Sequence, residues 1–179
     1  MTSVAKKGAP RSVTLWLAVH EAGHVIARLQ LVAAWHLNGL DNPPSLEAVE
    51  VWLDERGQPR GVCRWGYREP LSFRYQAMIS AAGPVAEARI RHANRYECLT
   101  AGEDYEIIMR SVRRGLADID EAVKEARFII RACWPEIMTL GTHLQTRHEL
   151  TFPEVSMLLD LKNRRGIYDE SDRPDMRYD

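Results

Sequence analysis

The segment from Val13 to Trp35 is the only long apolar run of the sequence, and it constrains the fold more than any other feature. Its pattern predicts a long, mostly buried helix from Val13 to about Ala34, with Ser12 as the N-cap residue. Four ionisable side chains interrupt the run: His20, Glu21, His24 and Arg28. Because burial of an unpaired polar group costs several kcal/mol, the two histidines and the glutamate need partners inside the fold.

The segment HEAGH, residues 20–24, matches the H-E-x-x-H signature of zinc proteases. Residues four apart lie one turn apart on the same face of a helix, so His20 and His24 can both bind one tetrahedral ion. Glu21 lies about 100° around the helix from His20, which suits a general base that takes a proton from water. The motif therefore predicts a zinc site with His20 and His24 as ligands and Glu21 as the catalytic base. Histidines satisfied by ordinary hydrogen bonds are the alternative interpretation.

A catalytic zinc site usually has three protein ligands and one open position, so a third ligand is needed. The metzincin pattern is excluded, because Ala27 and Gln30 occupy its glycine and third-histidine positions. His36 lies near the end of the predicted helix, and Glu47 and Glu50 fall in a strand pattern. The remaining candidates are acidic residues of the segment LTAGEDYEI, residues 99–107: Glu103, Asp104 and Glu106. Favourable charge at a helix N-terminus would also explain these acids.

The rest of the chain predicts a mainly α-helical domain with one small β hairpin beside the first helix. Alternating residues on both sides of the turn DERGQPR predict the hairpin over Ala48–Tyr67. Helical periodicity follows over Ser72–His92, where Gly83-Pro84 is expected to kink or break the helix. Further helices are predicted from near Gly102, from Asp118 to Cys133, from Glu136 to Arg147, and from the capping sequence TFPE at 151–154 through Leu161.

The segments HEAGH, ISAAGPVAEARI (79–90) and TAGED (100–104) together resemble the peptidase domain of FtsH-type AAA metalloproteases. In that family a His-Glu-Ala-Gly-His helix precedes a small hairpin, a Gly-Gly-x-x-Ala-Glu helix and a Thr-x-Gly-x-x-Asp segment whose aspartate binds zinc. The resemblance implies a helical zinc-metallopeptidase fold with His20, His24 and Asp104 as metal ligands and Glu21 as the base. It extends to HELTFPEVSMLL (148–159) and so covers most of the chain.

The sequence departs from the family pattern at several points. Pro84 stands where the family usually has glycine. TAGED is one residue shorter than the usual spacing, which keeps Glu103 and Glu106 as alternatives to Asp104. The sequence has no G-x-x-x-x-G-K-[ST] phosphate loop, so we expect a free-standing peptidase domain that does not itself use ATP.

Composition limits the classes of partner and location. A net charge of -1, with arginines scattered among acids, argues against nucleic-acid binding. The polar side chains of the first helix and the lack of a second apolar run argue against a membrane protein, including an intramembrane zinc protease. No signal peptide is recognised, and three distant cysteines (Cys63, Cys98 and Cys133) are expected to be free thiols in the cytoplasm. We expect a flexible N-terminus at 1–11, one domain at 12–162 and a disordered tail at 163–179.

The expected function is zinc-dependent hydrolysis of peptides or unfolded protein segments. An extended substrate could add to an edge of the predicted hairpin through backbone hydrogen bonds. A homo-oligomer and an ATPase that acts in trans stay open as partners. Two alternatives remain: a catalytically inactive zinc-binding module for interaction or regulation, and a regulatory protease that cleaves one specific repressor.

Overall fold

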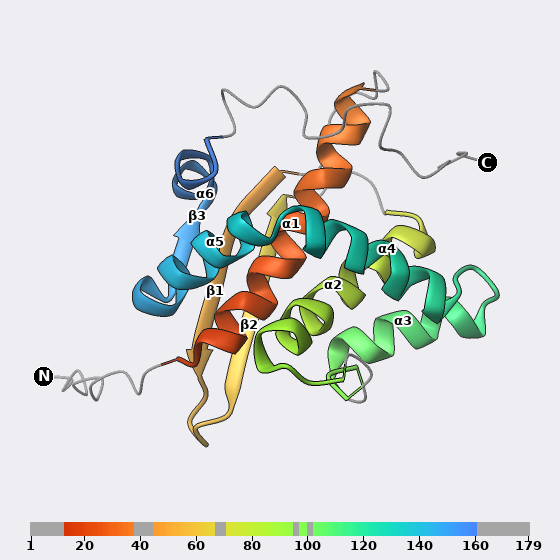
Figure 1. Cartoon of the computed structure of the whole chain (residues 1–179), viewed down its shortest axis with the longest axis horizontal. Helices are drawn as coiled ribbons and strands as arrows, with labels where there is room; N and C mark the ends of the chain where they lie inside the picture. Colours follow the sequence, from red (N-terminus) through yellow and green to blue (C-terminus); the bar gives the residue numbers. More distant parts are fainter. Residues whose placement is uncertain (1–12, 38–44, 67–70, 95–96, 100–101, 161–179) are drawn as a thin grey trace, which may run out of the picture.

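The computed structural model describes residues 13–37, 45–66, 71–94, 97–99 and 102–160 (Figure 1). The expected flexible N-terminus, the expected tail, Ser12, Tyr67 and Leu161 lie outside these described residues. The described part contains helices and strands in this order: α1 (Leu15–Leu37), β1 (Ser45–Leu53), β2 (Pro59–Gly66), α2 (Phe73–Arg91), α3 (Glu103–Arg113), α4 (Ile119–Ala132), α5 (Trp134–Arg147), β3 (Glu149–Thr151) and α6 (Phe152–Leu158). The prediction of a mainly α-helical fold with a small sheet is confirmed.

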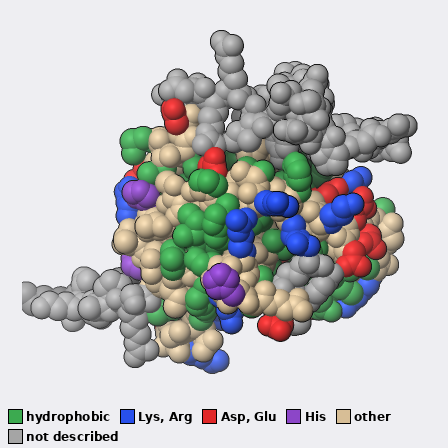
Figure 2. All heavy atoms as spheres, viewed as in Figure 1, with side chains coloured by type: hydrophobic (Ala, Val, Ile, Leu, Met, Phe, Trp, Pro, Cys, Tyr) green, Lys and Arg blue, Asp and Glu red, His purple; other side chains and the backbone are tan. Residues whose placement is uncertain are grey.

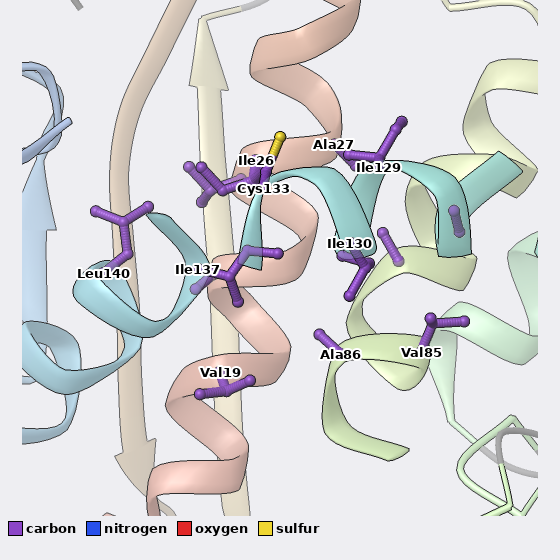
Figure 3. Close-up of a cluster of buried hydrophobic side chains, with 14 of the residues drawn as sticks. Val19, Ile26, Ala27, Val85, Ala86, Ile129, Ile130, Cys133, Ile137 and Leu140 are labelled. Atoms are coloured by element: carbon purple, nitrogen blue, oxygen red, sulfur yellow. The ribbon is translucent and has the colours of Figure 1, made fainter. Parts of the chain in front are cut away.

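Helix α1 is the centre of the fold, because it contacts α2, α4, α5 and both long strands (Figure 1). This position explains its apolar sequence: a helix covered on most sides cannot keep a wide polar face. Figure 3 shows side chains of α1, α2, α4 and α5 in one buried cluster, among them Val19 and Ile26 of α1. Ile130 of α4 and Ile137 of α5 belong to the same cluster and are almost completely buried. The core therefore fixes the position of the helix that carries HEAGH.

The three strands form one antiparallel sheet in the order β2-β1-β3. The predicted hairpin is present, and its turn is held by the Asp54 carboxylate, which accepts hydrogen bonds from the backbone N–H groups of Arg56 and Gln58. Strand β3 was not predicted; it pairs Leu150 with Val49 of β1. Within the described part of the chain, no strand pairs with the outer edge of β2. The sheet packs beside α1 through β1 and β2, as predicted.

Of the kink or break expected at Gly83-Pro84, the break does not occur, since α2 continues through both residues to Arg91. Proline in a helix interior normally costs about 3 kcal/mol, because it removes one N–H and crowds the preceding turn. Here the middle of α2 is buried against α1, and packing outweighs this local cost. The close approach depends on Gly23 of α1, where a Cβ atom would lie 2.8 Å from the carbonyl oxygen of Ala82. Packing with α1 thus keeps α2 intact where its own sequence disfavours a helix.

The starts of α4 and α6 follow their capping residues, whereas α5 begins earlier than predicted. The Asp118 carboxylate accepts a hydrogen bond from the N–H of Glu121 at the start of α4, as predicted. Helix α5 begins at Trp134 and not at Glu136, because a proline fits into the first helical turn. The Glu154 carboxylate accepts from the N–H of Thr151 at the start of α6, which ends at Leu158.

Figure 2 shows apolar side chains near the middle of one face, while acidic and basic side chains mix over α3 and α4. Some of these charges pair between helices: Arg74 of α2 forms ion pairs with Glu121 and Glu125 of α4. The three cysteines are free thiols. Among the described helices, none combines the length and the apolarity that crossing a membrane would require.

Candidate metal centre

Three side chains from α1 and α3 meet at the junction of α1, α2 and α3. Nε2 of His20 lies 3.0 Å from Oδ2 of Asp104, and Nε2 of His24 lies 3.1 Å from the same oxygen. The two Nε2 atoms are 3.1 Å apart. His20, His24 and Asp104 form the one group in the described part of the chain with the composition and spacing to hold a metal ion. All three side chains are largely covered, with 12% to 23% of their surface exposed.

The opposite ring nitrogens of both histidines are held by acceptors. Nδ1 of His20 lies 3.0 Å from Oε2 of Glu87, and Nδ1 of His24 lies 2.8 Å from the carbonyl oxygen of Ile79. A carbonyl or carboxylate oxygen can only accept here, so we assign a hydrogen to each Nδ1. In the neutral rings, each Nε2 then directs a lone pair towards the common centre. Metal-binding histidines characteristically use their second nitrogen in this way, with a carboxylate or backbone carbonyl as acceptor.

The chemistry of this donor set fits a cation. Two imidazole lone pairs and a carboxylate oxygen repel one another unless protons or a positive ion lie between them. Ligand atoms about 2.0–2.1 Å from a tetrahedral zinc ion are about 3.3 Å apart, close to the spacing observed here. Two nitrogens and one carboxylate oxygen are also ordinary zinc ligands. The group can therefore hold a metal ion with little movement.

Without a metal, protons take the place of the cation. Burial lowers the pKa of His20, but hydrogen bonds to Asp104 and Glu87 outweigh it and raise that pKa to about 10. Burial also lowers the pKa of His24, but the Asp104 charge, the hydrogen bond to Asp104 and the Glu21 charge together outweigh it and raise that pKa. Burial raises the pKa of Asp104, but the two histidines outweigh this and hold it well below its usual range. In the metal-free site the Asp104 carboxylate thus favours the protonated form of the imidazoles beside it.

Gly83 lets α2 approach both rings closely. A Cβ atom at this position would lie 2.3 Å from Nε2 of His24 and 2.7 Å from Cδ2 of His20. The carbonyl oxygen of Ile79, one turn before Gly83 on α2, accepts the hydrogen bond from Nδ1 of His24. Gly83 therefore shapes the wall of the site as well as the packing of α2.

Glu21 lies on the side of the site that faces β2. The residue is only 7% exposed. A Cβ atom at Gly61 of β2 would lie 2.1 Å from its Oε1, and the Cys63 thiol donates to its Oε2 across 3.4 Å. Burial raises the pKa of Cys63 well above its ordinary value, and the Glu21 charge adds to this, so the thiol stays protonated and can donate. The carboxylate of Glu21, which the motif predicts to be the catalytic base, is thus held between α1 and β2.

The structure also separates the three candidates for the third ligand. Asp104 is in the first turn of α3 and faces the histidines, whereas Glu103 and Glu106 in the same turn are exposed. Glu50 forms an ion pair with Arg64 in the sheet. Of the acids weighed from the sequence and described in the structure, only Asp104 reaches the two rings.

The sequence reasoning missed several residues that build the site. Glu87, which contacts His20, and Gly61 and Cys63, which contact Glu21, were not among the predicted site residues. A weak signal was present for Glu87, because it lies in the segment AAGPVAE that resembles the metalloprotease family. No sequence signal pointed to Gly61 or Cys63, since their role depends on how β2 packs against α1.

Comparison with known proteins identifies no family or relative for this chain. The sequence matches no family model, and it matches no curated protein. The likeness to FtsH-type peptidase domains therefore stays a prediction based on the quoted motifs.

Proposed function

We propose that this chain is a zinc-dependent metallopeptidase. One observation carries the proposal: Nε2 of His20, Nε2 of His24 and Oδ2 of Asp104 converge within 3.1 Å, while acceptors hold the reverse side of both rings. Metal-binding histidines characteristically donate from their second ring nitrogen to such an acceptor, which fixes the orientation of the ring. Zinc is the metal that best suits two imidazoles and a carboxylate in an H-E-x-x-H helix.

The residues divide the work as follows. His20, His24 and Asp104 would hold zinc, which when bound polarises a carbonyl group and lowers the pKa of water towards about 7. Glu21 accepts a proton from the attacking water and passes it to the leaving amine. Glu87 positions His20 and is itself paired with Arg91, one turn further along α2. Cys63 and Gly61 keep the Glu21 carboxylate against the face of β2 that packs on α1.

The substrate would be an extended peptide or an unfolded segment. Strand β2 contacts Glu21 through Gly61 and Cys63, and no described strand covers its outer edge. An extended chain added to that edge would form backbone hydrogen bonds beside the proposed base. Such binding recognises the backbone and so accepts many sequences, in keeping with an unfolded substrate.

The direct test replaces the proposed base. Glu21→Gln keeps the size of the side chain but cannot accept the proton, so cleavage of an unfolded protein or peptide should fall by a factor of about 10² to 10⁴. Zinc content, measured by metal analysis, should stay at the wild-type level. The exposed Glu106 provides the matched control, and Glu106→Gln should cleave as the wild type does.

Two results would overturn the proposal. Cleavage by Glu21→Gln at the wild-type rate would show that Glu21 is not the base. A wild-type protein that binds zinc, melts at lower temperature after chelation and cleaves nothing would instead be a zinc-binding module without activity.

A further inference from the structure

Arg28 is an ionisable side chain of α1 for which the proposed reaction gives no role. It follows His24 by one helical turn. Its direction is about 80° around the helix axis from His20, between the directions of His24 and Glu21. Arg28 therefore lies on the same side of α1 as the metal-binding group and the proposed base, displaced along the helix by about 6 Å from His24.

Strand β2 connects the surroundings of Arg28 with those of Glu21. The guanidinium carbon of Arg28 lies 4.3 Å from the centre of the Trp65 ring, an ordinary cation–π distance. Trp65 follows Cys63 by two residues, so both side chains point to the same face of β2. Cys63 contacts Glu21, and β2 thus runs along α1 from the proposed base to Arg28. A chain bound along this strand would pass both side chains.

The guanidinium of Arg28 lacks the partners that such a group normally has. Its Nε atom is buried and has no hydrogen-bond partner. No acidic side chain in the described part of the chain forms an ion pair with it, whereas five other arginines have such partners: Arg60, Arg64, Arg74, Arg91 and Arg147. Burial also lowers the pKa of Arg28. A partly buried cation without a counter-ion is unfavourable, and an anionic ligand would remove that cost.

We propose that Arg28 binds a carboxylate of the substrate and makes the site selective for peptides that are acidic next to the scissile bond. This inference rests on the proposed peptidase function. A planar guanidinium that is held over an aromatic ring presents its nitrogen atoms to a carboxylate with restricted freedom of orientation. One extended residue spans about 3.3–3.6 Å, so the separation along α1 corresponds to one or two residues from the scissile bond. An Asp or Glu side chain and a free C-terminal carboxylate share this chemistry.

Three fluorogenic peptides distinguish these sources of the carboxylate. The first has Glu beside the cleaved bond and an amidated C-terminus, the second has Gln at that position, and the third has Gln with a free C-terminal carboxylate close to the bond. We expect kcat/KM for one of the acidic peptides to exceed that of the neutral peptide by about tenfold or more, the usual effect of a charge-assisted hydrogen bond. The acidic peptide that is preferred identifies the source.

Two variants of Arg28 and one control isolate the contribution of the guanidinium. Arg28→Gln should remove most of the acidic preference. Arg28→Lys keeps the charge without the planar group and should retain part of it. Arg89 is the matched control, because its guanidinium also lies over a tryptophan ring: its carbon is 4.2 Å from the centre of the Trp134 ring. Neither residue belongs to the metal-binding group. Arg89→Gln should keep the full preference. Circular dichroism shows whether each variant is folded, and metal analysis shows whether it contains zinc.

Peptide binding separates this inference from the proposed function. Fluorescence anisotropy with the Glu21→Gln background measures binding of the same three peptides without cleavage. A preference for a carboxylate that Arg28→Gln abolishes supports the inference, even if the wild type cleaves nothing and the peptidase proposal fails. Equal binding and equal cleavage of the acidic and neutral peptides would overturn it. A full acidic preference in folded Arg28→Gln would also overturn it.

Discussion

Helix α1 meets its neighbours through two glycines that have the same steric role. Gly141 of α5 lies against Val19, where a Cβ atom would be 2.7 Å from a valine methyl carbon and 3.2 Å from the Val19 Cα. Gly83 of α2 lies against His20 and His24, where a Cβ atom would be 2.3 Å from Nε2 of His24. In both places a helix can approach α1 only because a side chain is missing.

The two contacts differ in what they hold. Around Val19 the neighbours are apolar, and any displaced group loses only packing energy. Around the histidines each ring has three polar contacts of defined direction, and a displaced ring loses its place among the ligand atoms. The apolar side therefore tolerates small shifts at a cost in stability, whereas the polar side converts them into a loss of metal affinity. Each prediction below tests part of this difference.

The largest loss of metal affinity is expected for Asp104→Asn, which removes the carboxylate that α3 contributes to the metal-binding group. Loss of a partner of a ligand typically costs about 10- to 100-fold in metal affinity, and loss of a ligand itself should cost more. Competition with a chromophoric chelator measures this affinity. The matched controls are Glu103→Gln and Glu106→Gln, in the same helical turn but exposed. Zinc loss in a control but not in Asp104→Asn would show that another acid is the third ligand.

The paired substitutions Gly83→Ala and Gly141→Ala compare the two sides directly. In Gly83→Ala the new methyl group pushes the imidazole rings, and zinc affinity should fall by about 10- to 100-fold, as for other losses of ligand orientation. Gly141→Ala overpacks the contact with Val19 and should cost about 1–3 kcal/mol in free energy of unfolding. Its zinc affinity should equal that of the wild type. Chelator competition and chemical denaturation give both quantities, and equal zinc losses in the two variants would contradict the comparison.

The elements that could be predicted are those whose signals are local. HEAGH marks its own helix, and the starts of α4 and α6 follow from single capping residues, Asp118 and Thr151. The hairpin follows from alternation on both sides of a turn. Each of these signals lies within a few residues of the feature it specifies, so no tertiary contact is needed to read it.

The parts that could not be predicted depend on contacts distant in the sequence. Asp104 is 84 residues from His20, so the residue pattern alone left it open among three acids and only the family resemblance implied it. The packing of α3 is what makes this acid, and not Glu103, face the ring. Strand β3 has three residues, too few for an alternating pattern, and exists because Leu150 pairs with Val49. Likewise, Pro84 signals a helix break locally, and burial against α1 overrides it.

The last prediction concerns protons, which distinguish the polar side from the apolar side without any mutation. The folded pKa of His20, about 10, is above the ordinary value of 6.5, so its proton stabilises the metal-free fold fully below about pH 6.5. This contribution is lost as the pH rises through about 10. Zinc needs the same nitrogen, so zinc uptake near neutral pH must release at least one proton.

Apparent zinc affinity should therefore rise by about tenfold per pH unit for each proton released, between about pH 6 and about pH 8. Calorimetry in buffers of different ionisation enthalpy counts the protons directly. Gly141→Ala should release the same number as the wild type, since the change is on the apolar side. Zinc uptake that is independent of pH and buffer would mean that the rings are already unprotonated, and that hydrogen bonds to Asp104 and Glu87 do not hold protons at this centre.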